Sequence, residues 1–219
     1  MSKRIRALAE LVPSGSVLAD IGTDHGLLPI LAIEQGIVSK AYACDVAEGP
    51  LSQAAANIAQ KGLQDSITTI LGNGFENVPE DCTSAVLAGM GYYTAAGILE
   101  DAIDRLGQFE AVIVQINADV PMLRKWISDH RFTIQKERTI EDRKKYYTAI
   151  VFNTDQHEAY TELQQYAGVE EVQEDKATWI EYLNWKRCGI MRIIEFGADP
   201  TEHEAELNAL NAILNRSEL

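Results

Sequence analysis

Residues 17–26 read VLADIGTDHG, and this stretch decides the fold of the chain. An apolar run ends in an acid, Asp20, and two glycines follow with a second acid, Asp24, between them. An apolar helical pattern then begins at Leu27. This order predicts a buried strand, a glycine loop and a helix N-terminus, the layout of a nucleotide-type cofactor site in an open α/β sheet.

Similar alternation of apolar strands and helices continues along the chain. Strands are predicted at residues 16–21, 40–44, 66–71, 84–88 and 111–115. Helices are predicted at residues 3–11, 27–35, 50–61, 93–106 and 120–130. A closing antiparallel pair is predicted at residues 132–136 and 147–153. Continuous apolar strands separated by helices are typical of a parallel sheet covered on both faces, so the fold class is α/β.

The pattern changes to helix alone after about residue 156. One amphipathic helix is predicted over residues 176–196, and a second begins after a sharp turn, with Asp199 as its N-cap and Pro200 in its first turn. A short link between two such helices predicts an antiparallel αα-hairpin. We therefore expect two units, residues 1–155 and residues 156–219.

Composition limits the classes of function. The chain has 219 residues and a net charge of −14, which argues against a general affinity for nucleic acid. Its three cysteines are widely spaced and its four histidines lack ligand spacing, so neither a disulfide framework nor a metal site is expected. No apolar run is long enough to span a bilayer, and the N-terminal segment does not resemble a signal peptide, so we expect a cytoplasmic protein.

The acids of the first loop indicate which cofactor it binds. A carboxylate inside the loop would repel the pyrophosphate of a dinucleotide, whereas it can pair with the ammonium of S-adenosylmethionine. Asp20 and Asp24 therefore favour S-adenosylmethionine over NAD. Asp45 ends the second strand, where an acid can accept both ribose hydroxyls. A helix cap or loop acid is the alternative for Asp45 alone, but two acids at the ends of neighbouring strands favour the cofactor role. Asn73 follows the third strand and can accept the adenine amine, or form a plain turn.

Two further loops follow strands four and five. Gly89, Met90 and Tyr92 lie in the first of these loops, where the glycine leaves room for a ligand and the tyrosine can either stack on a base or pack in the core. Asn117 ends the second, where its amide can fix a planar substrate. Both loops are expected at the carboxyl edge of the sheet, where ligands of this fold class bind.

Together these motifs resemble the bacterial tRNA (adenine-22-N1)-methyltransferase family, known as TrmK. The resemblance covers nearly the whole chain, including a C-terminal helical hairpin similar to the family's coiled-coil appendage. The chain departs from the family's usual pattern at Cys44-Asp45, Asn73, Tyr92, Ile116 and Tyr147. The matching segments are 2–4, 19–25, 48–50, 72–74, 88–91, 115–117, 123–126 and 141–146.

The resemblance implies a Rossmann-like class I methyltransferase sheet and methyl transfer from S-adenosylmethionine to N1 of an adenine in tRNA. Asp24 and Asn117 are the expected catalytic residues; Asp24 can also bind the methionine ammonium, and the sequence does not separate the two roles. The expected cofactor-binding residues are Asp20, Gly22, Thr23, Asp24, His25, Gly26, Asp45, Asn73, Gly74, Gly89 and Met90. The expected RNA-binding residues are Lys3, Arg4, Arg6, Tyr92, Arg143, Lys144 and Lys145.

Other functional hypotheses are also compatible with the sequence. The chain could methylate another RNA, a protein or a small molecule, or bind S-adenosylmethionine without catalysis and use its hairpin for interaction. The hairpin could grip RNA through Lys186, Arg187 and Arg192, or serve dimerisation or packing only. We expect tRNA as the partner, no membrane contact, no metal, and a monomer or weak dimer.

Overall fold

A seven-stranded mixed sheet forms the centre of the computed structural model, which describes residues 1–217. The strand order is β3-β2-β1-β4-β5-β7-β6; β1 to β5 are parallel and β7 is antiparallel to both neighbours. The strands are β1 Val17–Ile21, β2 Lys40–Asp45, β3 Ile67–Leu71, β4 Ser84–Met90, β5 Ala111–Ile116, β6 Phe132–Asp142 and β7 Lys145–Gln156. The expected α/β fold is confirmed.

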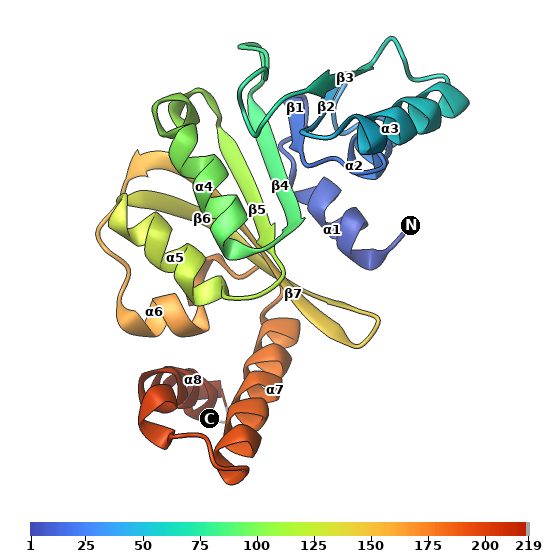
Figure 1. Ribbon diagram of the computed structural model, residues 1–219. Coiled ribbons are helices and arrows are strands. Elements are labelled where there is room, and N and C mark those ends of the chain that lie inside the picture. The colour runs from blue at the N-terminus through green and yellow to red at the C-terminus, as the bar shows by residue number, and fades with distance from the viewer. Residues whose placement is uncertain (218–219) are drawn as a thin grey trace.

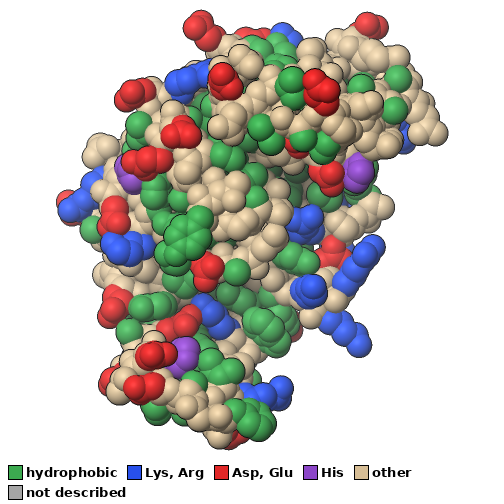
Figure 2. Space-filling view, in the orientation of Figure 1, with side chains coloured by type: hydrophobic (Ala, Val, Ile, Leu, Met, Phe, Trp, Pro, Cys, Tyr) green, Lys and Arg blue, Asp and Glu red, His purple; other side chains and the backbone are tan. Residues whose placement is uncertain are grey.

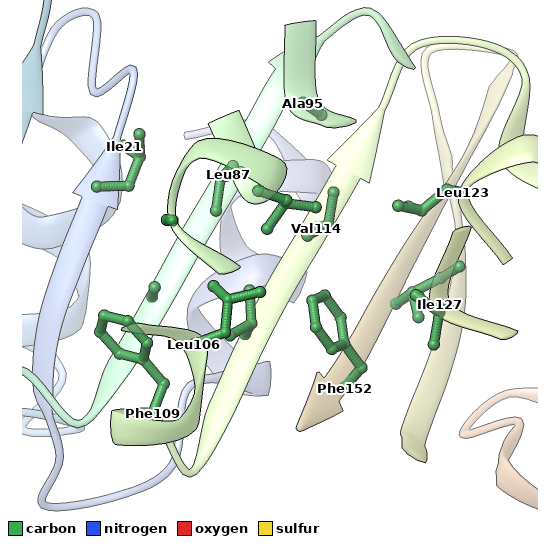
Figure 3. Packing of buried hydrophobic residues seen from close by; sticks show 14 of the residues in the cluster. Ile21, Leu87, Ala95, Leu106, Phe109, Val114, Leu123, Ile127 and Phe152 are labelled. Carbon is green, nitrogen blue, oxygen red and sulfur yellow. The ribbon is translucent and has the colours of Figure 1, made fainter. Parts of the chain in front are cut away.

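Helices cover both faces of the sheet (Figure 1). The helices of this part are α1 Lys3–Leu11, α2 Leu27–Glu34, α3 Glu48–Lys61, α4 Tyr92–Asp101 and α5 Val120–Asp129. Leu8, Leu28 and Ile58 place α1, α2 and α3 in one buried cluster. Leu99 and Leu123 place α4 and α5 in the other, which Figure 3 shows packed on the strands. The two clusters are the two faces of a sheet buried on both sides.

Among β1 to β5 and α1 to α5, three elements differ from the sequence prediction by two residues or more. Helix α3 begins at Glu48, not at Pro50, because a proline is tolerated throughout the first turn of a helix. Strand β4 continues through Met90, so Gly89 and Met90 belong to the strand rather than to a loop. The helix predicted over residues 93–106 breaks at Ala102 into α4 and a 3-10 helix, η1 Ile103–Gln108.

The β6–β7 hairpin is longer than the predicted pair. Its outer half is rich in charged residues, which hide the strand pattern, yet Ile140 is buried and Arg138 is paired with Glu10 of α1 at 2.8 Å. Helix α1 therefore covers this half of the hairpin. The two-residue turn is formed by Arg143 and Lys144, both with positive φ, as a tight hairpin turn requires.

The C-terminal region contains the two predicted helices and one that the sequence pattern did not reveal. Leu183 and Ile190 pack with Leu210 and Ile213 in a separate buried cluster, which also includes Ala167. Asp199 caps a 3-10 turn, η3 Pro200–His203, and not α8 itself, which begins at Glu204. The helices of this region are α6 Glu162–Ala167, η2 Glu170–Val172, α7 Lys176–Glu195 and α8 Glu204–Ser217.

A buried ion pair joins this region to the sheet. Arg124 of α5 donates from Nε to Glu137 Oε1 at 2.9 Å and from Nη2 to Oε2 at 2.8 Å, and both side chains are fully buried. Gln173 Nε2 also donates to Glu137, and Arg124 Nη1 donates to the carbonyls of Gln165 and Tyr166 at the end of α6. The pair thus connects α5, β6 and the segment after α6.

Removing the arginine should destabilise the fold strongly. Arg124→Met leaves the Glu137 carboxylate buried without a counter-charge, and we expect the free energy of unfolding in urea to fall by about 3–5 kcal/mol. The double variant Arg124→Met/Glu137→Met removes both charges and should lose less than the single variant. A loss below about 1 kcal/mol for Arg124→Met would show that the pair does not hold the junction.

Candidate functional site

The loop after β1 is fixed against the end of β2. The amides of Gly22 and Thr23 both donate to the Cys44 carbonyl at 2.9 Å, and Gly22 has a φ of 75°. Gly26 (φ 70°) is the N-cap of α2, where an added Cβ would come within 3.3 Å of Ala54 Cβ. Both positions therefore favour glycine, and the turn delivers Asp24 to the carboxyl edge of the sheet.

Asp20 is the buried acid of the site. It is 5% exposed and accepts a hydrogen bond from Thr23 Oγ1 at 2.6 Å. Burial raises the pKa of its carboxyl from 3.8 to about 7, and the Asp45 charge adds to this rise, while the Thr23 hydroxyl opposes it. Asp20 is therefore held where a nearby cation would stabilise its ionised form.

Two further acids lie at the surface of the same edge. Asp24 is exposed, has a φ of 52°, and places its Oδ2 3.5 Å from Nε2 of His25. Asp45 accepts from the amide of Ala47 at 3.0 Å and from the Asp24 amide at 3.4 Å. Backbone donors thus orient Asp45, while the Asp24 carboxylate stays open to a ligand.

Two neighbouring hollows contain most of the predicted cofactor residues. The first has a volume of about 640 Å³ and is lined by Asp20, Gly22, Thr23, Asp24, His25 and Gly89, among others. The second has a volume of about 460 Å³ and is lined by Gly22, Asp45, Asn73, Gly74 and Met90, among others. Gly22 borders both hollows, so they form one cleft. Gly26 lines neither hollow.

The β3 end of the cleft is a tight turn. Asn77 Nδ2 donates to the Leu71 carbonyl at 2.9 Å, and the Asn73 amide donates to Glu76 Oε2 at 3.3 Å. The Asn73 side chain is exposed and lines the second hollow. At Gly74 an added Cβ would come within 2.8 Å of Ile98, so this position admits no side chain without rearrangement.

Asn117 joins the end of β5 to the end of β4. Its side-chain amide donates to the Gly89 carbonyl at 2.7 Å, and its backbone amide donates to the Met90 carbonyl at 2.9 Å. The side-chain amide of Asn117 is therefore bonded to the protein itself, and the residue lies at the rim of the cleft.

Arg4 and Gln115 make a contact that the sequence did not indicate. Arg4 Nη1 donates to Oε1 of the buried Gln115 at 2.6 Å, and its guanidinium lies 5.4 Å from the centre of the Tyr147 ring. Arg4 also lines the first hollow beside Gly89. The arginine predicted to bind RNA is thus half-buried in the wall of the cofactor cleft.

The other residues predicted to bind RNA lie at the surface. Lys3 pairs with Glu141 at 3.4 Å, and Tyr92, at the start of α4, is partly exposed with its ring against Tyr93. Figure 2 shows Lys and Arg side chains gathered where Figure 1 shows the projecting β6–β7 hairpin. Among residues 1–217, no ion pair occupies the exposed side chains of Arg6, Arg143, Lys144 and Lys145.

Two features of residues 1–217 bear on other functions. No group of three or more His, Cys, Asp or Glu side chains in residues 1–217 is arranged to hold a metal ion. No helix within the same residues is long and apolar enough to cross a membrane. Cys44 and Cys82 are buried, and Cys188 is exposed.

Asp20 should make the free protein less stable as the pH rises. Because the pKa of Asp20 is about 7 in the folded protein and 3.8 in the unfolded chain, the stability contributed by the protonated carboxyl is present below pH 3.8 and lost as the pH rises to about 7. Relative to Asp20→Asn, which keeps an acceptor for Thr23 without a charge, wild-type stability should fall by about 1.4 kcal/mol per pH unit in this window. Both free energies of unfolding can be measured by thermal denaturation across this pH range. A difference between the two proteins that does not change with pH would contradict the prediction.

Comparisons with known proteins agree with this geometry. The methyltransferase domain family matches residues 1–150. The tRNA (adenine(22)-N(1))-methyltransferase of Bacillus subtilis (strain 168) is 33% identical over 171 residues, which cover 77% of this chain and 72% of that protein.

Solved structures extend the likeness to the whole chain. Streptococcus pneumoniae Sp1610 in complex with S-adenosyl-L-methionine has a TM-score of 0.86 at 30% identity and covers 98% of this chain and 99% of its own. The TrmK of M. capricolum in complex with S-adenosyl-homocysteine has a TM-score of 0.84 at 27% identity, and the match covers 98% of both chains. Given the matched domain and the matched length, the chain belongs to the tRNA (adenine(22)-N(1))-methyltransferase family.

Proposed function

We propose that this protein transfers a methyl group from S-adenosylmethionine to N1 of adenine 22 in tRNA. The observation that carries the proposal is the acid-lined cleft at the ends of β1 and β2, found in a chain that belongs to the family named for this reaction. A tRNA substrate also fits a cytoplasmic location, which we propose with it. We assign cofactor binding to residues 1–155 and a supporting role in RNA binding to residues 156–219.

The two hollows suit the two ends of S-adenosylmethionine. Asp20 and Asp24 in the first hollow are acceptors for the methionine ammonium, and His25 lies beside Asp24. In the second hollow, Asp45 is an acceptor for the ribose hydroxyls and Asn73 for the adenine amine. No carboxylate of the cleft has to approach a phosphate, since this cofactor carries none. When bound, S-adenosylmethionine supplies an electrophilic methyl group.

Little proton chemistry is required of the protein. Neutral adenine already has a lone pair at N1, and methylation leaves a positive charge on the base. The open Asp24 carboxylate can stabilise that charge or accept a proton from the N6 amine. Asn117 holds the Gly89 carbonyl at the rim of the cleft and thereby shapes the entrance for the base.

An acidic protein still offers RNA a local basic surface. The turn residues Arg143 and Lys144, with Lys145, carry unpaired positive charge at the tip of the β6–β7 hairpin. Lys3 and Arg6 lie on α1, which packs against the same hairpin. We propose these residues as phosphate contacts, which orient an RNA without reading its sequence.

The substrate assignment has a direct test. Tritium from labelled S-adenosylmethionine should enter a tRNA transcript that carries adenine at position 22, and nuclease digestion with mass spectrometry should locate the label as 1-methyladenosine. A matched transcript with guanine at position 22 should stay unlabelled. Equal labelling of both transcripts would reject adenine 22 as the target.

Substitutions of two acids in the cleft should distinguish cofactor binding from methyl transfer. Asp45→Ala removes the ribose acceptor and should raise the Kd of S-adenosylmethionine by about 10- to 100-fold, measured by calorimetry. Asp24→Asn should lower the single-turnover rate at saturating cofactor and RNA by about 100-fold. An Asp24→Asn protein with a wild-type single-turnover rate and a weakened cofactor Kd would make Asp24 a binding residue only.

A further inference from the structure

A second pocket lies beyond Asn117, between the carboxyl end of β5, the start of β7 and helix α7. Its volume is about 380 Å³, and it is separate from the two hollows of the cofactor cleft. We call it the aromatic pocket. The residues that define it are Asn117, Tyr146, Thr148, Tyr182, Trp185 and Lys186.

Three rings form its wall. Tyr146 lies 5.7 Å from both Tyr182 and Trp185, measured between ring centroids, and the Tyr182 and Trp185 rings are stacked at 6.2 Å. Trp185 is nevertheless 58% exposed, whereas Trp126 and Trp179 are buried. Trp185 thus presents a large aromatic face to solvent, unlike the other two tryptophans of the chain.

The polar groups of the pocket are suited to a planar heterocycle. Thr148 is 3% exposed, and its hydroxyl has no hydrogen-bond partner within residues 1–217. Lys186 is paired with Glu206 at the rim. A ring with hydrogen-bonding edges would satisfy the buried hydroxyl while stacking on the aromatic wall, which a purely apolar ligand would not do.

The position of the pocket connects it with the cofactor cleft. Asn117 lines the aromatic pocket, while its side chain bonds the Gly89 carbonyl of the first hollow. Tyr147 and Tyr166 also border the pocket, but Arg4 lies over the Tyr147 ring, and neither ring belongs to the cluster of Tyr146, Tyr182 and Trp185. A strand bound across the edge of the sheet would therefore meet the cleft and the pocket in succession.

Charge indicates how an RNA would be held here. Residues 156–219 contain 5 Lys and Arg against 13 Asp and Glu, so this region offers phosphates little net attraction. Lys145, adjacent to Tyr146 in the chain, belongs to the unpaired basic tip of the hairpin. Stacking on the three rings, with phosphate contacts confined to the hairpin tip, is the mode of binding that this distribution allows.

We infer that the aromatic pocket binds an unpaired nucleobase of the RNA substrate, separate from the base that receives the methyl group. This inference rests on the proposed function, because that function makes RNA the substrate. Trp185 and Tyr182 stack on the base, and Thr148 accepts or donates a hydrogen bond at its edge. The pocket thus positions the RNA relative to the cleft and takes no part in methyl transfer.

Trp185 supplies both the variant and the signal for a test. The full-length protein is titrated with the tRNA transcript without cofactor, and RNA binding is followed by filter retention and by tryptophan fluorescence. Trp185→Ala should raise the RNA Kd by about 5- to 150-fold, the range expected for one stacked base. Trp185→Phe keeps a stacking ring, so it should retain the wild-type Kd and lose the fluorescence quenching.

A control variant on the same helical segment removes an exposed ring outside the pocket. Phe196 is 85% exposed just after α7, so Phe196→Ala should leave the RNA Kd unchanged. The Kd of S-adenosylmethionine, measured by calorimetry, should be unaltered in all three variants. Thr148→Val should weaken RNA binding less than Trp185→Ala does.

The outcomes separate this inference from the proposed function. A wild-type Kd for Trp185→Ala, the absence of quenching that depends on Trp185, or the absence of RNA binding by the wild-type protein would each overturn the inference. If instead Trp185→Ala weakens RNA binding while the wild-type protein leaves adenine 22 unmethylated, the inference stands and the proposed function fails. The quenching experiment decides the question even if Trp185→Ala does not fold, because Trp185→Phe preserves the ring.

Discussion

The placement of the C-terminal helices depends on the buried pair of Arg124 and Glu137. Neither charge reaches water, so each needs the other and further hydrogen bonds to offset its desolvation. Gln173 and the last carbonyls of α6 supply those bonds, which ties the segment around α6 to α5 and β6. Gly168 lies against the same group, where an added Cβ would come within 2.8 Å of the Glu137 carboxylate. A mispositioned C-terminal region would therefore leave buried charge unpaired.

The cofactor cleft follows from strand order. Strand β1 lies between β2 and β4, the place where the order of a parallel sheet reverses and where ligands bind beyond the strand ends. Asp20 lies one residue before the end of β1 and Asp45 ends β2, and no cation pairs with either among the described residues. The raised pKa of Asp20 is the electrostatic consequence, because burial and a neighbouring acid both oppose its ionisation. A ligand that brings an ammonium to this edge reverses that balance, which explains why the cleft suits S-adenosylmethionine better than a phosphate-bearing cofactor.

The sequence predicted the features that local patterns determine, and it missed those that depend on contacts between distant parts of the chain. Strands β1 to β5 were predictable because strands buried on both faces are continuous apolar runs, and the cofactor loop was predictable because its acids and glycines are local. The outer half of the β6–β7 hairpin was not, since its charged pattern becomes a strand only where α1 covers it. Helix α6 has six residues and was missed because so short a segment shows little periodicity. The contact of Arg4 with Gln115 joins residues far apart in the chain, and nothing local to either indicates it.

A net charge of −14 does not by itself prevent this protein from binding RNA. At physiological ionic strength, charges more than about 8 Å apart are largely screened, so an RNA responds to the side chains that it touches. Around the site those are the unpaired basic residues of the hairpin tip and the rings of the aromatic pocket. Phosphate contacts weaken with salt because they release counterions, whereas stacking depends on contact with the faces of the rings. An acidic enzyme that relies on few phosphate contacts would hold non-specific RNA poorly, and this favours recognition of a substrate whose unpaired base fits the aromatic pocket.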